Sequence, residues 1–596
     1  MKNLSLIVLT SFLLLSSFSF AQDTKSYSDQ KEIVEKYLSE RNEIYFKFYV
    51  SSKDILKKLA NEISIDNVKD NVINYEVIAY ANTDGMYKFK EYNINFVVMT
   101  PPSLQFPVKM SNNLDEITGQ WDVYPTYEAY VNMMNAFATN YPNLCRIVNI
   151  GTTVSGRVLL FAVISDSVNF RKPKPRFQYS SSIHGDELTG YVNMLRLIDT
   201  LLSGYGNNTK ITELVKNVEI WINPLANPDG TYYGGNGTVN GARRANQNSY
   251  DLNRNFPDFH EGPNPGGTWQ PETITFMNLF GQYNFSLSMN FHGGAQVLNY
   301  PWDSESPLHP DDDWWIHIAK TYIDTIHAIN PSYMTDSLGY PNIPGIVNGY
   351  SWYTISGGRQ DYMTFFKGGK EVTSEISTTK LVPANTLPNY WNWNHKSWLN
   401  YIKECLYGVR GIITDSISNL PLKAKVRVQG REYMNDSTAI FSDTTCGDYH
   451  RMLPTGTYTL IVKAPGHYPK TISGVYVKYD STTLLNIKLR PFATGIIESE
   501  TPVTFSLSQN YPNPFNPTTN IKYSIPENGE WKTGNGLVTL KVFNILGKEV
   551  VTLVNQKQSA GDYEIKFDGK NLSSGIYFYK LTAGDYSDVK SMILIK

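Results

Sequence analysis

Apolar and polar residues follow two different periods along this chain, and the change from one period to the other marks its regions. Between residues 118 and 406, segments with apolar residues at helical spacing alternate with short apolar runs at 159–164, 218–222 and 285–291. The clearest helical segment carries Leu188, Val192, Leu195, Ile198 and Leu202 on one face. This alternation predicts an α/β domain with a central mixed or largely parallel β-sheet flanked by helices.

Residues 22–110 show a shorter mixture of the same two periods. Residues 31–41 are spaced as an amphipathic helix, and residues 43–50 alternate as a strand does. A helical stretch at 52–63 and strand-like runs at 75–81 and 92–99 follow. We therefore expect a small α+β module, joined to the next domain by a linker from Pro101 to Gly119. The pattern fits a pro-segment that is removed and an accessory domain that is retained equally well.

From residue 408 onward only strand patterns remain, separated by turn residues. The short β segments in 408–491 are spaced as in a small β-sandwich. A linker of mixed composition, 492–504, leads to a second all-β module at 505–596, with strands expected at 538–543 and 575–581. The predicted fold class is therefore an α/β domain that follows a small α+β module and precedes two all-β sandwich domains.

The first 21 residues have the pattern of a signal peptide. Lys2 precedes an apolar run from Leu4 to Phe20, and small residues end it at Ala21. A membrane anchor is the alternative, but the run is shorter than the ~20 residues needed to span a bilayer. We expect cleavage after Ala21 and export of the chain. No later stretch is long and apolar enough to be a transmembrane anchor.

Charge and cysteine content exclude several classes of function. The chain has 53 basic and 55 acidic residues, so it has no long-range field that would favour nucleic acid. We therefore expect no nucleic-acid partner. The three cysteines, Cys145, Cys405 and Cys446, are far apart and allow at most one intramolecular bridge. They form neither a disulfide framework nor a thiolate metal site.

His184, Glu187 and His292 have the pattern of a catalytic metal site. A catalytic zinc takes three nitrogen or oxygen ligands and keeps one position open, and two ligands close in sequence with a third far away meet that need. Bound Zn²⁺ would lower the pKa of its water to ~7 and polarise a carbonyl. A His-x-x-Glu pair alone carries little weight, because such pairs are common as solvated surface groups.

Hydrolysis at such a metal also needs a general base and a cation for the developing oxyanion. Glu375 and Arg244 are the candidates for these two roles. Taken alone, each would more often be an ordinary surface group, so the assignment of these two roles depends on the other motifs in the sequence.

The region 120–406 resembles the zinc metallocarboxypeptidase family, with its carboxypeptidase A-like fold, and in particular the branch of carboxypeptidases N, E and D. The matching segments are His184–Glu187, Asn227–Gly230, Arg244–Asn246, Asp251–Asp258, His292–Pro301 and Trp352–Tyr362. The resemblance implies that the metal ligands are His184, Glu187 and His292, and that Glu375 is the base. It also implies that Arg244 stabilises the oxyanion and that the terminal carboxylate of the substrate is held by Asn253, Arg254 and Tyr353.

The residue chemistry agrees with this reading. An exopeptidase must recognise a free carboxylate, and the guanidinium of Arg254 offers a bidentate fork that a lysine lacks. Asp251 fits a partner of a ligand histidine, which would fix the tautomer of that histidine. It fits a local turn residue equally well.

Two further residues bear on specificity. Asp303 lies eleven residues after His292 and matches the aspartate that the N/E/D branch places at the bottom of the pocket for the departing side chain. Gln360 falls on a second position of that pocket. A buried carboxylate there would pair with a basic side chain, which predicts preference for C-terminal Lys or Arg. The alternative is that Asp303 is a solvated loop residue, because Asp303-Ser-Glu-Ser306 departs from the usual family sequence.

The two C-terminal modules also resemble known domains. Residues 408–491 are similar to the transthyretin-like sandwich that follows the catalytic domain in the same branch. Residues 505–596 resemble the C-terminal sorting domain of the type IX secretion system, on the segments Asn510–Pro517, Gly547–Val550 and Leu572–Lys580. That resemblance implies a Gram-negative cell whose export and type IX machinery deliver the protein to the medium or the outer cell surface. The alternative is an immunoglobulin-like adhesion module that stays in the mature protein.

The sequence thus favours a secreted zinc carboxypeptidase that acts on peptide or protein C-termini. One alternative is a non-catalytic surface protein that binds peptides or adheres through the same fold, and another is a zinc amidase that acts on cell-wall peptides. Retention of the expected ligands and base argues against the first. The set formed by Asn253, Arg254 and Tyr353 favours a terminal α-carboxylate and argues against the second.

Overall fold

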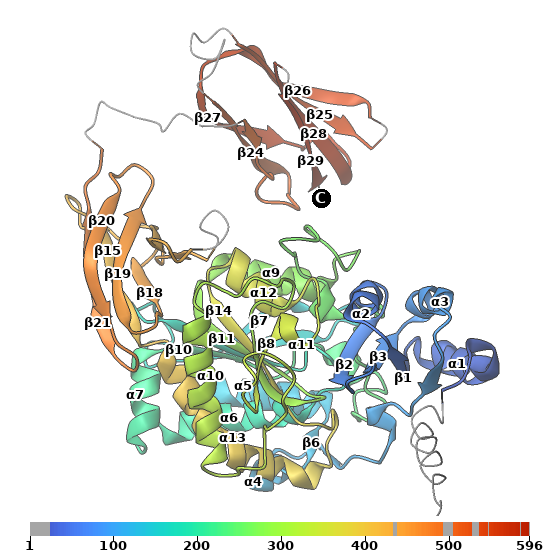
Figure 1. Ribbon diagram of the computed structural model, residues 1–596. Coiled ribbons are helices and arrows are strands. Elements are labelled where there is room, and N and C mark those ends of the chain that lie inside the picture. The colour runs from blue at the N-terminus through green and yellow to red at the C-terminus, as the bar shows by residue number, and fades with distance from the viewer. Residues whose placement is uncertain are drawn as a thin grey trace, which may run out of the picture. The chain divides into compact units, whose positions relative to one another are not determined.

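The computed structural model describes residues 24–432, 438–492, 505–526, 536–545, 547–584 and 586–594. The predicted signal peptide, residues 1–21, lies outside the described residues, as does nearly all of the predicted linker 492–504. The chain divides into two compact units, Met1–Pro491 and Phe492–Lys596. Figure 1 colours the first unit from blue to orange and the second in red.

An eight-stranded mixed sheet forms the centre of the first unit, with strand order β13-β12-β14-β11-β9-β10-β8-β7. Its strands are β7 (Cys145–Thr152), β8 (Val158–Ile164), β9 (Arg176–Ser181), β10 (Glu219–Asn223), β11 (Phe285–His292), β12 (Gln296–Tyr300), β13 (Ile346–Asn348) and β14 (Lys370–Ile376). The strands β10, β9, β11 and β14 run parallel, whereas β8 and β12 are antiparallel to their central neighbours. The predicted mixed sheet is thereby confirmed.

Helices cover both faces of this sheet, as the continuous burial of its central strands requires. Along β8, Leu160 and Ala162 pack into one apolar cluster, and Phe161 and Val163 pack into the other. The first cluster lies under α5 (Tyr127–Asn140), α6 (Thr189–Gly204), α10 (Asp312–His327) and α13 (Leu387–Glu404). The second lies under α9 (Pro271–Gln282) and α12 (Arg359–Phe366). The helix predicted from Leu188 to Leu202 corresponds to α6.

The N-terminal module is a four-stranded sheet of order β2-β3-β1-β4 with three helices. Its elements are α1 (Tyr27–Arg41), β1 (Ile44–Val50), α2 (Lys53–Ala60), β2 (Ser64–Asp70), β3 (Tyr75–Ala81), α3 (Thr83–Glu91) and β4 (Phe96–Val98). The apolar pattern predicts neither β2 nor α3. The module packs on the α/β body, because its apolar core includes Val297 and Trp352.

The expected linker from Pro101 to Gly119 is more ordered than its composition indicates. It contains η1 (Pro102–Leu104), β5 (Met110–Ser111), which pairs with β6 (Tyr124–Pro125), and most of α4 (Leu114–Gln120). Ser103 is fully buried, and its hydroxyl donates to the carbonyl of Ala242. This segment therefore lies against the α/β body.

Two sheets enclose one apolar core in the region 408–491, as predicted for a β-sandwich. One sheet contains β15 (Gly408–Asp415), β18 (Asp448–Arg451), β21 (Thr482–Leu484) and β22 (Ile487–Leu489), and the other contains β16 (Lys425–Val428), β17 (Ile440–Phe441), β19 (Gly456–Lys463) and β20 (Lys470–Val477). Buried ion pairs join it to the α/β body. Arg451 of the sandwich lies beside Asp311, which also pairs with Lys370.

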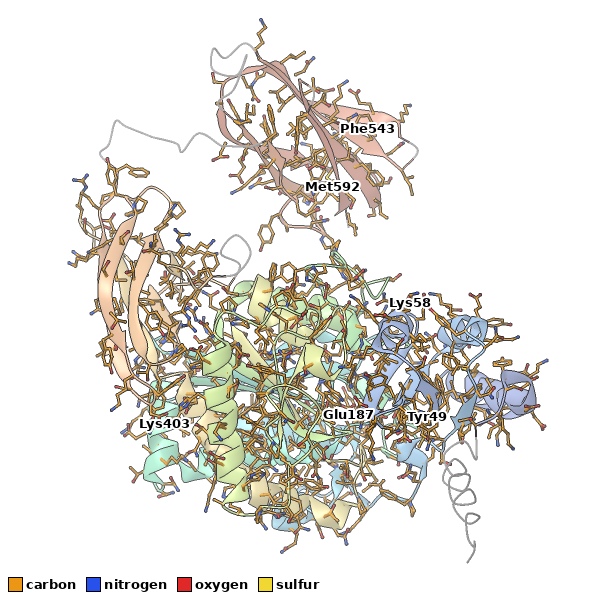
Figure 2. All side chains as sticks on the ribbon, in the orientation of Figure 1. Tyr49, Lys58, Glu187, Lys403, Phe543 and Met592 are labelled. Atoms are coloured by element: carbon orange, nitrogen blue, oxygen red, sulfur yellow. The ribbon has the colours of Figure 1, made fainter. Side chains whose placement is uncertain are left out.

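The second unit is also built from two β-sheets, again as predicted. One sheet has the order β23-β24-β27 and the other β26-β25-β28-β29. The strands are β23 (Ser506–Leu507), β24 (Thr518–Ile525), β25 (Gly536–Asn544), β26 (Glu549–Gln558), β27 (Gly561–Asp568), β28 (Gly575–Ala583) and β29 (Tyr586–Leu594). Met592 is fully buried between them (Figure 2).

Two chain-wide expectations concern cysteines and membrane spans. Cys145, Cys405 and Cys446 are free thiols, and the first two are buried. Over the part of the chain that the structure describes, no helix has both the length and the apolar character needed to cross a bilayer.

Candidate active site

His184, Glu187 and His292 come together in the interior of the α/β body. His184 and Glu187 lie in the connection between β9 and α6, and His292 is the last residue of β11. Their ligand atoms all lie within 4.8 Å of one another, and the three residues are buried. Figure 2 shows Glu187 inside the α/β body. Two neighbouring parallel strands end at this point, which is where open α/β sheets form ligand sites.

The donor atoms of this cluster fit a divalent metal ion. The Nδ1 atoms of His184 and His292 lie 3.0 Å apart. Each also lies 2.9 Å from a carboxylate oxygen of Glu187. Burial lowers the pKa of His292 to about 4, so its ring is neutral and presents a lone pair at neutral pH. Two nitrogens and one carboxylate that converge on one point are the donor set of catalytic zinc.

The outer nitrogens of the two imidazoles have partners that free the inner ones for a metal. Asp251 Oδ1 lies 3.1 Å from His184 Nε2. The side-chain amide of Asn290 lies 2.7 Å from His292 Nε2, with its nitrogen on that side. Among the described residues, none provides a hydrogen-bond partner for the buried Asn290 Oδ1. A 180° rotation of this amide lets its oxygen accept from His292 Nε2–H. Both Nδ1 atoms are then unprotonated, as metal binding requires.

Glu375 lies on β14, beside His292 on the neighbouring strand β11. The two residues are register partners in the pairing of β11 with β14. Burial first, and the negative charge of Glu187 second, raise the pKa of Glu375 well above its ordinary value. A raised pKa suits a carboxyl group that must take up and release a proton near neutral pH.

Arg244 lies between the metal-ligand cluster and the loop of Asp251. Its Nη1 is 3.2 Å from Glu187 Oε1, and its Nε is 3.1 Å from Asp251 Oδ2. The guanidinium is buried, so its charge acts where water does not screen it. This position is suitable for a cation that stabilises an oxyanion beside the metal.

The residues of the expected carboxylate clamp line the same cavity as the metal ligands. Asn253 and Arg254 lie on the 3-10 helix η2 (Leu252–Arg254), and Tyr353 follows α11 (Gly349–Trp352). Asp251 caps η2 by accepting from the backbone N–H of Asn253 at 2.8 Å. Because it also contacts His184, Asp251 meets both descriptions that the sequence left open, turn residue and histidine partner.

Asp303 lines a second part of this cavity, and Gln360 contacts it from α12. Asp303 is only 3% exposed, so the alternative reading as a solvated loop residue is wrong. Its Oδ1 accepts from Asn299 Nδ2 and from Gln360 Nε2, both at 3.0 Å. Burial raises the pKa of Asp303 to about 6, which leaves the carboxylate ionised at neutral pH.

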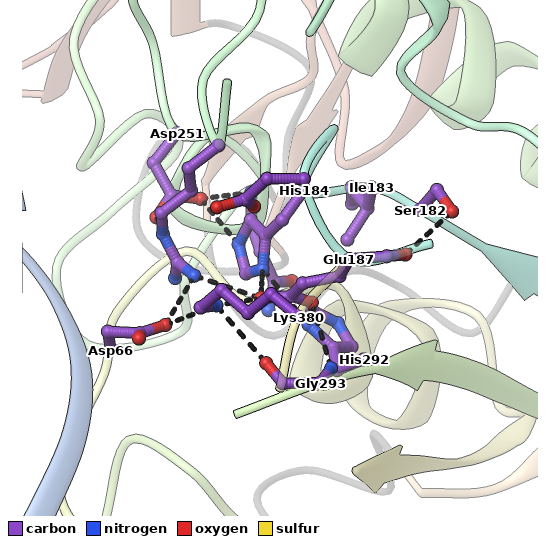
Figure 3. A network of polar contacts seen from close by, with 12 residues as sticks. Asp66, Ser182, Ile183, His184, Glu187, Asp251, His292, Gly293 and Lys380 are labelled. Atoms are coloured by element: carbon purple, nitrogen blue, oxygen red, sulfur yellow. Dashed lines mark hydrogen bonds and ion pairs between the residues drawn. The ribbon is translucent and has the colours of Figure 1, made fainter. Parts of the chain in front are cut away.

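Three further residues of the site have no signal in the sequence: Asp66, Tyr80 and Lys380. Lys380 is buried beside the metal-ligand cluster, and its Nζ donates to Glu187 Oε1 and to the carbonyl of Gly293. Asp66 belongs to β2 of the N-terminal module. Its Oδ1 lies 2.9 Å from Arg244 Nη1 and 2.6 Å from Lys380 Nζ (Figure 3).

The strand β2 places Asp66 in the cavity that the metal ligands line. Its pairing with β3 shifts register between Ile65 and Asn67, and a bulge of this kind re-aims a side chain. The Ile65 carbonyl accepts from Arg254 Nη2 at 3.0 Å, and the Asp66 carbonyl accepts from the Tyr353 hydroxyl at 3.3 Å. The N-terminal module therefore forms hydrogen bonds with Arg254 and Tyr353 of the expected clamp and an ion pair with Arg244.

Two further contacts of the module support this placement. The Tyr80 hydroxyl, on β3, donates to Asp186 Oδ2 at 2.6 Å. Asn67 Nδ2 donates to the Gly294 carbonyl at 2.9 Å. Asp186 and Gly294 flank metal ligands in the sequence, so β2 and β3 lie directly over the cluster.

Comparisons with known proteins agree with this geometry. A family model described as zinc carboxypeptidase matches residues 130–397, and one described as a secretion system C-terminal sorting domain matches residues 509–596. Mouse (Mus musculus) carboxypeptidase M is 37% identical over 369 residues, which are 58% of this chain and 79% of that protein. Human (Homo sapiens) carboxypeptidase D is 34% identical over 384 residues, which are 61% of this chain but only 26% of that protein.

Solved structures also show similarity to this chain. The structure of carboxypeptidase A from Helicoverpa armigera has a TM-score of 0.44 at 17% sequence identity. The match covers 60% of this chain and 95% of that one.

Proposed function

Since the chain belongs to the zinc carboxypeptidase family, we propose that this secreted metallocarboxypeptidase removes single basic residues from the C-termini of peptides and proteins and is made in a latent form. One observation carries the proposal. A single cavity is lined by the metal-ligand cluster, the base, the carboxylate clamp and a buried carboxylate, and its lining includes His184, Glu187, His292, Glu375, Arg244, Asn253, Arg254, Tyr353 and Asp303.

His184, Glu187 and His292 would hold the Zn²⁺ ion. Bound there, Zn²⁺ would act as a Lewis acid on the scissile carbonyl and make water more acidic. Asp251 fixes His184 from outside, because a carboxylate that accepts from the far ring nitrogen sets both the tautomer and the ring orientation.

The remaining steps belong to residues of the chain. Glu375 takes a proton from the attacking water and returns it to the departing amino group, which its raised pKa allows. Arg244 stabilises the negative charge that develops on the carbonyl oxygen. Arg254, Asn253 and Tyr353 hold the terminal carboxylate, so only the last peptide bond of a chain reaches the base.

Asp303 accounts for the proposed preference for Lys and Arg. Two amides occupy its Oδ1, from Asn299 and Gln360. A basic side chain of the substrate would pair with the carboxylate, whereas an apolar side chain would leave a buried charge without a partner, at a cost of ~2–5 kcal/mol. The set formed by Asn253, Arg254 and Tyr353 favours a terminal carboxylate and thereby argues against a zinc amidase that acts on cell-wall peptides.

The contacts of β2 support an inhibitory role for the N-terminal module. Asp66 places a carboxylate between Arg244 and Lys380, and the carbonyls of Ile65 and Asp66 engage Arg254 and Tyr353. A substrate needs these same groups. We therefore favour a pro-segment over a retained accessory domain, with activation by proteolysis between the module and the α/β body.

The sorting domain supports secretion or attachment at the cell surface. We assign its delivery to a Gram-negative export pathway that ends in type IX secretion.

The defining test uses the purified full chain, treated by limited proteolysis until its activity no longer rises. Its kcat/KM is measured on peptides that differ only in their last residue: Arg, Lys, Leu, Phe or Glu. We expect release of the last residue, with Arg and Lys preferred. Internal cleavage, or no release from any peptide, would contradict the exopeptidase, and equal rates on Arg and Leu would contradict the role of Asp303 alone.

Removal of the metal is expected to abolish activity, because His184, Glu187 and His292 would then lack the ion that polarises the carbonyl. A chelator should bring the release of C-terminal Arg to background. Added Zn²⁺, but not Mg²⁺, should restore it, since two imidazoles and one carboxylate suit zinc. Activity that persists after the metal content has been shown to be zero would exclude the proposed mechanism.

Gly349→Ala is expected to damage the pocket of Asp303. A Cβ on Gly349 would lie 1.7 Å from Asp303 Oδ1, so the carboxylate must move. Overpacking typically costs 1–3 kcal/mol, and we expect kcat/KM for a peptide ending in Arg to fall by about tenfold or more. Gly119→Ala is the matched control, because a Cβ there meets nothing within 4 Å. An unchanged rate for Gly349→Ala would show that substrates do not use this pocket.

A further inference from the structure

The loop that carries Asp303 is held by a second buried carboxylate, that of Asp361. Asp361 lies in the first turn of α12 and is 2% exposed. The backbone N–H of Asp303 lies 3.0 Å from its Oδ1 and 3.1 Å from its Oδ2. The Ser304 N–H and hydroxyl donate to Oδ2 at 3.0 and 2.8 Å. Three donors of the loop therefore form hydrogen bonds with the side chain of Asp361.

The position of Asp361 explains why a carboxylate can stand so close to Asp303. The first turn of a helix favours negative charge. Burial, and then the charge of Asp303, raise the pKa of Asp361, while the hydrogen bonds from Asp303 and Ser304 oppose that rise. Both oxygens of Asp361 act only as acceptors, so these contacts favour the ionised form. The donors of the loop thus reduce the repulsion between the two carboxyl groups, while burial and that repulsion still hold the pKa of Asp361 well above its ordinary value.

The first turn of α12 contacts both the carboxylate clamp and the pocket carboxylate Asp303. The backbone N–H of Arg359 donates to Asn253 Oδ1 at 2.9 Å, in the carboxylate clamp. The next residue, Gln360, donates to Asp303 Oδ1. Asp361 then fixes the backbone of Asp303. Three consecutive residues of α12 therefore set the distance between the clamp and the pocket carboxylate.

One oxygen of Asp303 stays available in this arrangement. Asn299 and Gln360 both donate to Oδ1, and no hydrogen bond from the described residues ends on Oδ2. A cationic side chain of the substrate can therefore pair with Oδ2. The direction of that oxygen depends on the backbone of Asp303, which is the part that Asp361 holds.

We propose that Asp361 is a positioning residue that aims Asp303 at the departing side chain and thereby sets the selectivity for basic over apolar C-terminal residues. The inference rests on the proposed function, because it explains how the preference arises. Asp361 is not among the residues that line the cavity. Its loss should therefore change the discrimination between substrates more than the rate of hydrolysis.

The test compares Asp361→Ala and Asp361→Asn with the unchanged chain, each activated by limited proteolysis. The kcat/KM values are measured on two peptides that differ only in a terminal Arg or Leu. Asp361→Ala leaves three donors of the loop without their acceptor, which should lower the Arg:Leu ratio by about tenfold or more, through a higher KM for the Arg peptide. Asp361→Asn retains one acceptor oxygen and should give an intermediate ratio. Product inhibition by free L-arginine should weaken in the same order.

Asp336→Asn is the matched control. Asp336 Oδ2 accepts from the backbone N–H of Gln296 at 2.8 Å, at the other end of β12 from Asp303. This variant also loses a carboxylate that anchors backbone, but its Arg:Leu ratio should stay unchanged. Ser304→Ala removes a single donor to Asp361 and should lower the ratio slightly, which keeps the test decisive if Asp361→Ala fails to fold.

Two results would overturn the proposal. One is an unchanged Arg:Leu ratio in both Asp361→Asn and Ser304→Ala, and the other is an equal loss of kcat/KM on the Arg and Leu peptides. The proposed function fails in a different way, since the unchanged chain itself would then show no preference for Arg.

Discussion

Glu375→Gln is expected to lower kcat for release of C-terminal Arg by about 10³-fold, within the 10²–10⁴ range for general acid–base groups. Gln has the same shape but cannot take the proton from water or return it to the leaving amine. The buried Glu375 Oε2 has no hydrogen-bond partner within the described structure, so the change removes no protein contact there. The measurement is kcat and KM of the activated chain on a peptide ending in Arg.

KM and the thermal unfolding midpoint should change little in Glu375→Gln, because the carboxylate clamp stays intact. Glu261→Gln, at an exposed position of the same body, controls for the loss of an acidic group. A Glu375→Gln variant with more than a tenth of the original kcat would assign the base to another residue.

Asp66→Ala is expected to activate the chain without proteolysis. The substitution removes the carboxylate that pairs with Arg244 and Lys380, and loss of one partner of a buried charge pair costs ~2–5 kcal/mol. The equilibrium between the blocked and open cleft should then shift toward the open state. We expect the uncleaved variant to hydrolyse a peptide ending in Arg at least ~10-fold faster than the uncleaved unchanged chain.

Asp54→Ala is the matched control for Asp66→Ala, because Asp54 is an exposed acidic residue of the same module. It should leave the uncleaved chain latent. After limited proteolysis all three proteins should reach the same kcat/KM, since the module no longer contributes. Full activity of the unchanged, uncleaved chain would show that β2 does not block the cleft.

That the candidate site residues come together was largely predictable, because many of them lie in short motifs. His184 and Glu187 share one connection after a strand, and Asn253 and Arg254 share one turn capped by Asp251. Local backbone geometry fixes such neighbours, so their spacing in the sequence carries information about their spacing in space. The α/β alternation was predictable for a similar reason, since the periods of 3.6 and 2 record which face is buried.

The strand β2 and its contacts with the candidate site were not predictable in this way. Polar residues, among them Asp66, Asn67 and Lys69, interrupt its apolar pattern, and the register shift after Ile65 breaks the period of two. Asp66 is buried only because Arg244 and Lys380 lie opposite it. A strand whose burial depends on charges from distant parts of the chain has no periodic signal of its own.

The sequence by itself determined the α/β architecture with its flanking modules, the membership in the zinc carboxypeptidase family, and the identity of the candidate metal ligands and base. The tertiary structure alone decided that β2 contacts the candidate site, that Lys380 joins the cluster, and that Asp303 is buried with its backbone N–H on Asp361. The first group depends on contacts between near neighbours and on periodic burial, both of which leave a trace in residue order. The second depends on charge pairs and backbone contacts between segments far apart in the chain, which form only when the fold brings them together.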